Sequence, residues 1–227
     1  SPLSATMAPQ NDTDAAISPS PRQRPRYGLW LVVAALLVVA GLVAWTLING
    51  RLPFTPPALH GTVIQSPDRV PDFTLDASSG GRVSLSDLRG KVVLIYFGYT
   101  FCPDACPTTM AELKKVPPAL GRSADDVQVV MISVDPQRDT PEVLREYLAH
   151  FDPSFLGLTG TDAEILAAAT PLGIYYSAHE GSPATGYLVD HTTSVLAIDR
   201  EGYLRIIYSF ETPGEAIAED MRWLLRQ

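Results

Sequence analysis

The hydrophobic positions of this chain begin with one long block near its start. Residues 29–48 are twenty consecutive residues without a charged side chain, the length a helix needs to cross the hydrocarbon core of a bilayer. We therefore predict one transmembrane helix over residues 27–50. A cleaved signal peptide is the alternative, but its apolar core is shorter and ends in a small-residue motif that is not evident here. Three arginines within residues 22–26 precede the block, so the positive-inside rule places the N-terminus in the cytoplasm.

Polar stretches lie on both sides of this block. Residues 1–26 are rich in Pro, Ser, Ala and Gln and have no hydrophobic periodicity, which predicts a disordered cytoplasmic N-terminus. Residues 51–69 contain four prolines and predict an extended tether. Residues 70–227 carry no repeat and are long enough for one well-buried domain.

Within residues 70–227 the pattern alternates between strands and helices. Residues 92–98 are the uninterrupted apolar run that is typical of a strand buried on both faces. Thr140, Thr161 and Thr212 are expected N-caps, the last two in capping boxes with Glu164 and Glu215. The other predicted elements are a hairpin at 72–85, strands at 127–134, 174–178, 187–189, 193–198 and 204–208, and helices beginning near Pro107 and covering 140–151, 161–170 and 213–226. This order predicts an α/β sandwich with a mixed central sheet and an extra hairpin.

Charge and cysteine content narrow the possible functions. The chain has a net charge of -8 and two cysteines. An acidic domain argues against nucleic acid as a partner. The cysteines, Cys102 and Cys106, are too close in sequence to form a disulfide framework. They are therefore expected to react or to bind.

Cys102 and Cys106 follow the buried strand and lie where the helix near Pro107 begins. The peptide dipoles at a helix N-terminus lower the pKa of a thiol and favour the thiolate, which both attacks disulfides and binds metals. Residues at i and i+4 share one face of a helix, so both sulfurs can converge on one atom. Soft thiolates select copper(I), zinc or an iron–sulfur cluster, and two of them call for a third ligand.

The four histidines are the natural candidates for that ligand. His60 in the tether, His150 at a helix end and His179 in a loop are interpreted as surface residues. His191 lies between two predicted strands, in a loop that can meet the cysteines. Spacing alone leaves a ligand role and a structural role for His191 equally open.

Three separated segments carry a family resemblance. YFGYTFCPDACPTTM, SVDPQRDTP and VDHTTSVLAID resemble the Sco/SenC family of membrane-anchored, thioredoxin-like copper proteins, over roughly residues 65–227. The resemblance implies a thioredoxin-like fold, with copper bound by Cys102, Cys106 and His191. Two thiolates and an imidazole suit copper(I), and copper(II) would accept them with an added oxygen ligand.

The resemblance also implies a function and a location. The expected function is a metallochaperone that is loaded by another copper chaperone. It would deliver copper to the binuclear copper site of a cytochrome c oxidase subunit. The chain would be a single-pass protein of the inner membrane, with its folded domain in the periplasm, or in the intermembrane space if the protein is mitochondrial.

Other functions use the same residues. In a thiol-disulfide reductase, Cys102 would attack, because it precedes the helix and is expected to be more exposed, and Cys106 would resolve. A peroxidase is less favoured because no arginine is evidently placed across the pocket, and a zinc hydrolase because no glutamate adjoins the ligands. Asp104 and Asp190 are candidates to support the ligands from outside or to meet a partner, and also fit simple solvated acids. The loop of residues 135–139 follows a predicted parallel strand, where α/β proteins build sites, so one alternative is that it lines the same site. The favoured interpretation is that Arg138 and Asp139 brace this loop ahead of the Thr140 cap.

Overall fold

The protein is described here from a computed structural model, which covers residues 27–49, 58–182 and 186–227. The chain divides into two compact units, Ser1–Pro57 and Ala58–Gln227. The expected disordered N-terminus and residues 51–57 of the expected tether lie outside the described residues.

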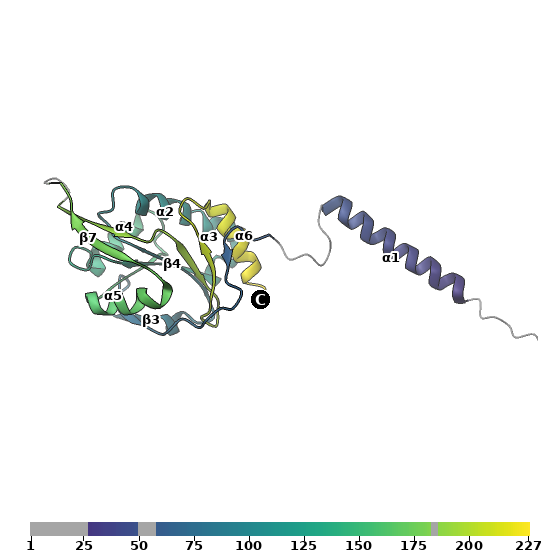
Figure 1. Cartoon of the computed structure of the whole chain (residues 1–227), viewed down its shortest axis with the longest axis horizontal. Helices are drawn as coiled ribbons and strands as arrows, with labels where there is room; N and C mark the ends of the chain where they lie inside the picture. Colours follow the sequence, from purple (N-terminus) through teal and green to yellow (C-terminus); the bar gives the residue numbers. More distant parts are fainter. Residues whose placement is uncertain (1–26, 50–57, 183–185) are drawn as a thin grey trace, which may run out of the picture. The chain divides into compact units, whose positions relative to one another are not determined.

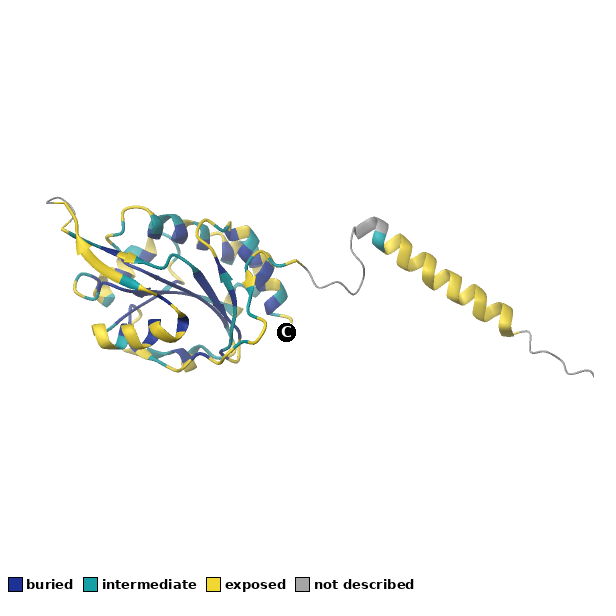
Figure 2. Cartoon of the chain, in the orientation of Figure 1, coloured by how far each residue is buried: buried dark blue, intermediate teal, exposed yellow. Residues whose placement is uncertain are grey.

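The described part of the first unit is one helix, α1 (Tyr27–Asn49). Its side chains are exposed along nearly its whole length (Figure 2), and the stretch Tyr27–Thr46 has a mean hydropathy of 2.5. A helix that is apolar on all sides is stable where it is surrounded by lipid. By length and composition, α1 therefore fits the predicted membrane span.

The second unit is built on a mixed sheet of eight strands. The strands follow the order β1 (Thr62–Val63), β10 (Leu204–Tyr208), β9 (Val195–Ile198), β4 (Val92–Gly98), β5 (Val127–Ser133), β6 (Leu156–Thr159), β2 (Thr74–Ala77) and β3 (Arg82–Ser84). β4, β5 and β6 are parallel and the other pairs are antiparallel. All seven residues of β4 are buried, as expected of a strand covered on both faces.

Helices cover this sheet. They are η1 (Leu85–Leu88), α2 (Ala105–Leu113), α3 (Val116–Leu120), η2 (Gly121–Asp126), α4 (Pro141–Ala149), α5 (Asp162–Ala169), η3 (Thr170–Leu172) and α6 (Gly214–Leu224). In Figure 1, α2, α3 and α6 lie on one side of β4, and α5 and β3 lie on the other. The central strands β4, β5 and β9 are the most deeply buried part of the unit (Figure 2). The expected mixed sheet and its extra hairpin, β2–β3, are confirmed.

Two of the three expected helix caps form. The Thr140 side chain accepts from the Val143 amide, and Thr161 forms its capping box with Glu164. The capping box at Thr212 does not form. The Thr212 hydroxyl donates instead to the Ser209 carbonyl at 2.8 Å, and α6 begins at Gly214.

Two short strands were not expected from the sequence. β1 pairs with β10, so the folded unit includes residues 58–69, which the sequence placed in the tether. β6 pairs with β5 and β2. Both strands have four residues or fewer, too short for an alternation of polar and apolar positions to identify them.

A second, two-stranded sheet consists of β7 (Tyr176–Glu180) and β8 (Tyr187–His191). β8 extends two residues beyond the predicted strand and ends at His191, which pairs with Tyr176. His191 is therefore the last residue of a strand and does not lie in a loop.

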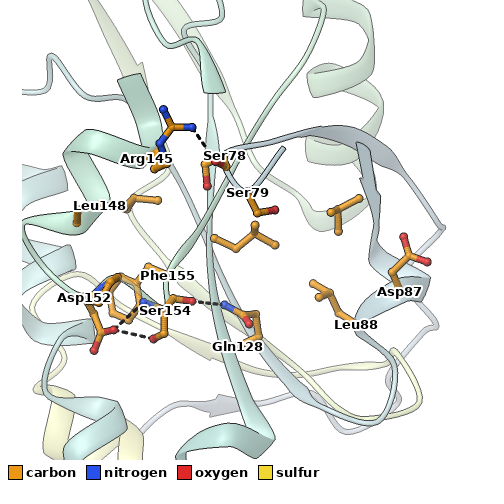
Figure 3. A pocket seen from close by; sticks show the side chains of 14 residues that line it. Ser78, Ser79, Asp87, Leu88, Gln128, Arg145, Leu148, Asp152, Ser154 and Phe155 are labelled. Atoms are coloured by element: carbon orange, nitrogen blue, oxygen red, sulfur yellow. Dashed lines mark hydrogen bonds between the residues drawn. The ribbon is translucent and has the colours of Figure 1, made fainter. Parts of the chain in front are cut away.

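A cavity of about 600 Å³ lies against η1 and α4 (Figure 3). Its lining includes Leu88, Gln128, Arg145 and Phe155. No cysteine or histidine lines it, so this cavity is separate from the thiols.

Candidate metal centre

The end of β4 brings the cysteine loop close to the sheet. A Cβ atom at Gly98 would lie 2.9 Å from the Cys106 sulfur and 2.7 Å from a ring carbon of Tyr96. Carbon atoms do not approach other atoms that closely, so only glycine leaves room for the sulfur here. Gly98 is thus part of what places Cys106 beneath the end of the sheet.

The two thiols occupy different environments. Cys106 lies in the first turn of α2 and is fully buried, whereas Cys102 lies ahead of the helix and is partly exposed. The Cys102 sulfur accepts from the Cys106 amide at 3.4 Å. The sulfurs therefore meet because the loop folds back over the helix N-terminus, and not because both residues share a helix face as their spacing suggested.

His191, the last residue of β8, also lies next to the buried thiol of Cys106. Its Nε2 lies 3.3 Å from the Cys106 sulfur. The rings of Tyr96 and Tyr99 stand edge-on to the imidazole, with centroids 5.8 and 5.9 Å away. The histidine ring is therefore enclosed by aromatic side chains next to the sulfur.

The hydrogen bonds of His191 determine its tautomer. Its Nδ1 lies 3.1 Å from the Thr192 carbonyl oxygen. A carbonyl only accepts, so Nδ1 carries the proton and the Nε2 lone pair faces the thiols. Neutral imidazole with a free Nε2 is the form that binds a metal. Asp190, the other candidate to orient this ring, points away and lies 3.5 Å from His179.

The ligand atoms of Cys102, Cys106 and His191 all lie within 4.8 Å of one another. Over the described ranges, this is the one group of three Cys, His or acidic residues close enough to hold a metal ion. Two sulfurs and one imidazole nitrogen form a soft donor set, which suits copper(I). The residues present thus fit a copper ion.

The pKa values of the two thiols move in opposite directions. The pKa of Cys102 is lowered to about 3, first by the hydrogen bond with Cys106 and further by two backbone amides, while burial opposes the shift. The pKa of Cys106 is raised by its hydrogen bond with Cys102, by burial and by the charge on Cys102. The pair therefore loses its first proton from the more exposed sulfur.

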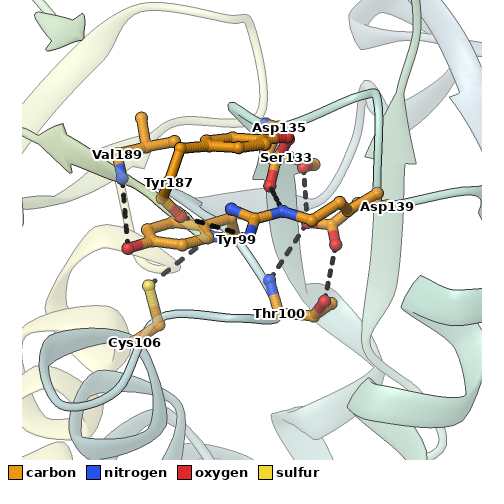
Figure 4. Close-up of polar contacts among 9 residues, drawn as sticks. Tyr99, Thr100, Cys106, Ser133, Asp135, Asp139, Tyr187 and Val189 are labelled. Atoms are coloured by element: carbon orange, nitrogen blue, oxygen red, sulfur yellow. Dashed lines mark hydrogen bonds and ion pairs between the residues drawn. The ribbon is translucent and has the colours of Figure 1, made fainter. Parts of the chain in front are cut away.

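Two hydrogen-bond donors that the sequence did not identify lie close to the Cys106 sulfur. The Tyr99 amide lies 3.5 Å from this sulfur (Figure 4), and the Tyr96 hydroxyl lies 3.6 Å from it. In the sequence, Tyr96 belongs to the buried run at residues 92–98, and Tyr99 directly follows that run. An aromatic residue in a buried strand is expected to pack in the core, so nothing in the sequence distinguishes the role of Tyr96 from that of its apolar neighbours.

Asp139 connects the cysteine loop to β5. Its buried carboxylate accepts from the Thr100 amide at 3.0 Å, the Thr100 hydroxyl at 2.5 Å and the Ser133 hydroxyl at 2.6 Å (Figure 4). Burial raises the pKa of this carboxyl, and the three donors oppose that rise. Asp139 does brace a loop, but the loop is the one that carries Cys102.

Arg138 lies beside the cysteine loop, which agrees with the alternative interpretation that its own loop lines the site. Its guanidinium packs 4.9 Å from the Phe101 ring centroid and 5.8 Å from that of Tyr99. An arginine is thus present beside the cysteine loop, so its supposed absence is not an argument against a peroxidase. Its Nε and Nη1, however, bond to the Asp135 carboxylate and the Tyr187 carbonyl.

The other histidines lie away from the thiols. His60 bonds to Asp220 at 3.0 Å, and His150 bonds to the Glu146 carbonyl within its own helix. His179 is exposed on β7. Asp104 is exposed at the N-cap of α2, and its side chain makes no capping bond.

Comparisons with known proteins agree with this site. The model of the family described as SCO1/SenC matches residues 62–226. Protein SenC of Rhodobacter capsulatus is 35% identical over 190 residues, which cover 83% of this chain and 85% of SenC.

Solved structures share the fold. Bradyrhizobium japonicum ScoI with copper bound is 37% identical and superposes with a TM-score of 0.64, covering 70% of this chain and 100% of ScoI. BsSco, described as having a disulfide switch and as a member of the Sco family of cytochrome c oxidase assembly proteins, is 26% identical. Its TM-score is 0.54, over 71% of this chain and 96% of BsSco. The predicted thioredoxin-like fold is confirmed, and the chain belongs to the SCO1/SenC family of copper-binding proteins in cytochrome c oxidase assembly.

Proposed function

We propose that this protein is a metallochaperone that carries copper on Cys102, Cys106 and His191. The observation that supports this most directly is the convergence of the three ligand atoms within 4.8 Å. Thiolate and neutral imidazole ligands give copper(I) three soft donors, and copper(II) would need a further oxygen ligand. The copper-bound state of the related ScoI agrees with this assignment.

Delivery requires that a second protein can reach the ion. Cys102 is partly exposed while Cys106 is fully buried, so an incoming ligand would replace the Cys102 sulfur first. A three-coordinate ion leaves room for that ligand. The acceptor we propose is the cytochrome c oxidase subunit with the binuclear copper site, and a separate copper chaperone would load the protein.

The location follows from α1 and the charges before it. We assign α1 as a membrane anchor with its N-terminus in the cytoplasm, because arginines precede it within residues 22–26. The copper-binding unit would then lie in the periplasm, or in the intermembrane space of a mitochondrion.

A second function uses the same thiols as a reductant. Both cysteines are free, and the pKa of the exposed one is lowered to about 3. Attack by the Cys102 thiolate on a disulfide of the copper-accepting subunit, followed by resolution by Cys106, would transfer two electrons. The partner would leave as a dithiol, and this protein would keep a Cys102–Cys106 disulfide. The disulfide switch of BsSco supports this possibility.

Replacing His191 separates the two functions. In the full chain in detergent, His191→Ala should lower the affinity for copper(I) at least about tenfold. Loss of a residue that only supports a metal ligand already lowers metal affinity by about tenfold or more, and His191 is proposed as a ligand itself. Disulfide exchange, which needs only the thiols, should change less than about threefold. Copper(I) affinity is measured by competition with a chromophoric chelator.

The matched control is His150→Ala. His150 is exposed and is the C-cap residue of α4, away from the thiols. This substitution should leave both readouts unchanged. A His191→Ala variant that binds copper(I) as tightly as the parent would rule out the three-ligand site. Failure of the parent to transfer copper to an apo acceptor, with efficient disulfide exchange, would favour the reductase.

A further inference from the structure

The third ligand is carried by a hairpin that forms its own sheet. β7 and β8 pair with each other, while both cysteines adjoin β4 in the larger sheet. Backbone pairing within the hairpin does not by itself determine how far His191 lies from the thiols. The short connection to β9, residues 192–194, and the contacts of β8 with the unit around the larger sheet therefore set that distance.

The strongest of these contacts lies at the other end of β8. The Tyr187 hydroxyl donates to the Asp135 carboxylate at 2.5 Å (Figure 4). Arg138 Nη1 donates to the Tyr187 carbonyl at 3.2 Å, and the guanidinium stacks 3.8 Å from the Tyr187 ring centroid. The start of β8 is thus held through its backbone, its hydroxyl and its ring face.

Asp135 gives this contact a rigid base. It lies two residues after the end of β5 and is 3% exposed. Its amide donates to the Ser133 hydroxyl at 3.0 Å, and its carboxylate forms an ion pair with Arg138. The Arg138 side chain is 19% exposed, so the pair is largely shielded from water, where charge-assisted hydrogen bonds are strong.

The same guanidinium also contacts the cysteine loop. Its carbon lies 4.9 Å from the Phe101 ring centroid, and Phe101 immediately precedes Cys102. Tyr99, 5.8 Å away, accepts from the Val189 amide in the middle of β8 at 3.3 Å. Arg138 therefore bridges the two segments that carry the ligands, the loop of Cys102 and the strand of His191.

We propose that Arg138, anchored by Asp135, is a positioning residue that holds β8 so that His191 faces the two thiols. Its consequence for copper rests on the proposed function, whereas its effect on the position of His191 does not. An arginine is required because one planar group must bond to Asp135, bond to the Tyr187 carbonyl and stack on the Tyr187 ring. A lysine keeps the charge but offers neither the fork nor the flat face.

The variants are made in the full chain in detergent. Arg138→Ala removes the bridge, and Arg138→Lys retains only its charge. Tyr187→Phe removes only the hydroxyl bond to Asp135 and leaves both contacts of Arg138 with residue 187. Arg138→Lys therefore serves if Arg138→Ala does not fold. Arg122→Ala is the matched control, because Arg122 is an exposed arginine in η2.

The first readout needs no copper. Nuclear Overhauser contacts between the His191 and Tyr96 rings, whose centroids are 5.8 Å apart, and exchange protection of the Val189 amide are compared among variants. Arg138→Ala should weaken both, Arg138→Lys should restore neither fully, and Arg122→Ala should match the parent. Unchanged ring contacts and protection in Arg138→Ala, or in Arg138→Lys where the first variant is unfolded, would overturn the proposal.

The second readout is copper(I) affinity in two backgrounds. Arg138→Ala should lower the affinity of the parent about tenfold, as is typical for groups that orient a metal ligand. It should lower that of His191→Ala less than about twofold, because a residue that acts through His191 has no further effect once the imidazole is gone. Equal losses in both backgrounds would overturn the proposal. If the parent binds no copper, the proposed function fails and the ring contacts still decide the role of Arg138.

Discussion

At the scale of single residues, the site consists of two thiols with opposite properties. Cys102 is partly exposed and accepts hydrogen bonds, while Cys106 is buried beneath Tyr96 and Tyr99. One negative charge is therefore stabilised at the exposed sulfur and a second is opposed at the buried one. The sulfur that a partner can reach is also the one that carries the charge.

We predict that alkylation of Cys102 is nearly independent of pH. Its pKa is lowered to about 3, so Cys102 stays a thiolate from pH 5 to 8. An ordinary thiol with a pKa of about 8.5 instead reacts roughly tenfold faster for each pH unit gained over this range. Because the folded pKa is lower than the unfolded one, this group favours folding increasingly as pH rises from about 3 toward 8.5. Iodoacetamide rates on the reduced, copper-free protein, with mass-spectrometric assignment of the modified residue, measure this.

The control for this experiment is an unfolded sample in denaturant, in which both thiols should show ordinary pH dependence. A folded-state rate for Cys102 that climbs about tenfold per pH unit would contradict the prediction. It would mean that the hydrogen bonds from the Cys106 side do not stabilise the thiolate.

At the scale of elements, one buried carboxylate joins the first strand of the folded unit to its last helix. Asp220 in α6 is 1% exposed. It accepts from the His60 amide at 2.9 Å, the Gly61 amide at 3.1 Å and the His60 ring at 3.0 Å. Residues just before β1 are thereby attached to α6 as well as to the sheet.

Asp220→Ala should therefore destabilise the folded unit. Two amides and a ring nitrogen would lose their acceptor in a partly buried place, which costs about 2–3 kcal/mol. For a domain of this size the melting temperature should fall by roughly 4–10 °C. Thermal unfolding followed by circular dichroism measures the change.

Glu219→Ala is the neighbouring control. Glu219 is mostly exposed and approaches His60 only at 3.7 Å, so its removal should change stability by less than about 0.5 kcal/mol. Equal effects of the two substitutions would show that Asp220 does not hold this junction.

At the scale of the whole molecule, the described residues form an apolar helix and a folded unit that begins at Ala58. The boundary matters because β1, and His60 and Gly61, which bond to Asp220, lie before residue 70. The region matched by the family model also begins before residue 70, at residue 62.

Two truncations test this boundary. A chain of residues 58–227 should fold and leave the membrane fraction, because it keeps β1 and lacks α1. A chain of residues 70–227 should melt at a lower temperature, because β10 loses β1, one of its two partner strands, and Asp220 loses the donors that it accepts from. Membrane fractionation and thermal unfolding are the measurements, and equal melting temperatures would contradict the assignment of residues 58–69 to the fold.

The sequence by itself determined the features that depend on local composition. The apolar run of α1, the buried run of β4, the caps at Thr140 and Thr161, and the cysteine pair before a helix all follow from short-range patterns. The order of motifs was enough to identify the family and to select His191 among four histidines.

Only the tertiary structure decided the features that depend on contacts distant in sequence. It placed β1 beside β10, gave Asp139 to the cysteine loop, bonded His191 to the Thr192 carbonyl instead of to Asp190, and brought Arg138 against β8. The physical reason is that a local pattern records which residues are buried or turned, but not which partner they meet. The position of His191 against the thiols depends on such partners, because its strand belongs to a separate sheet.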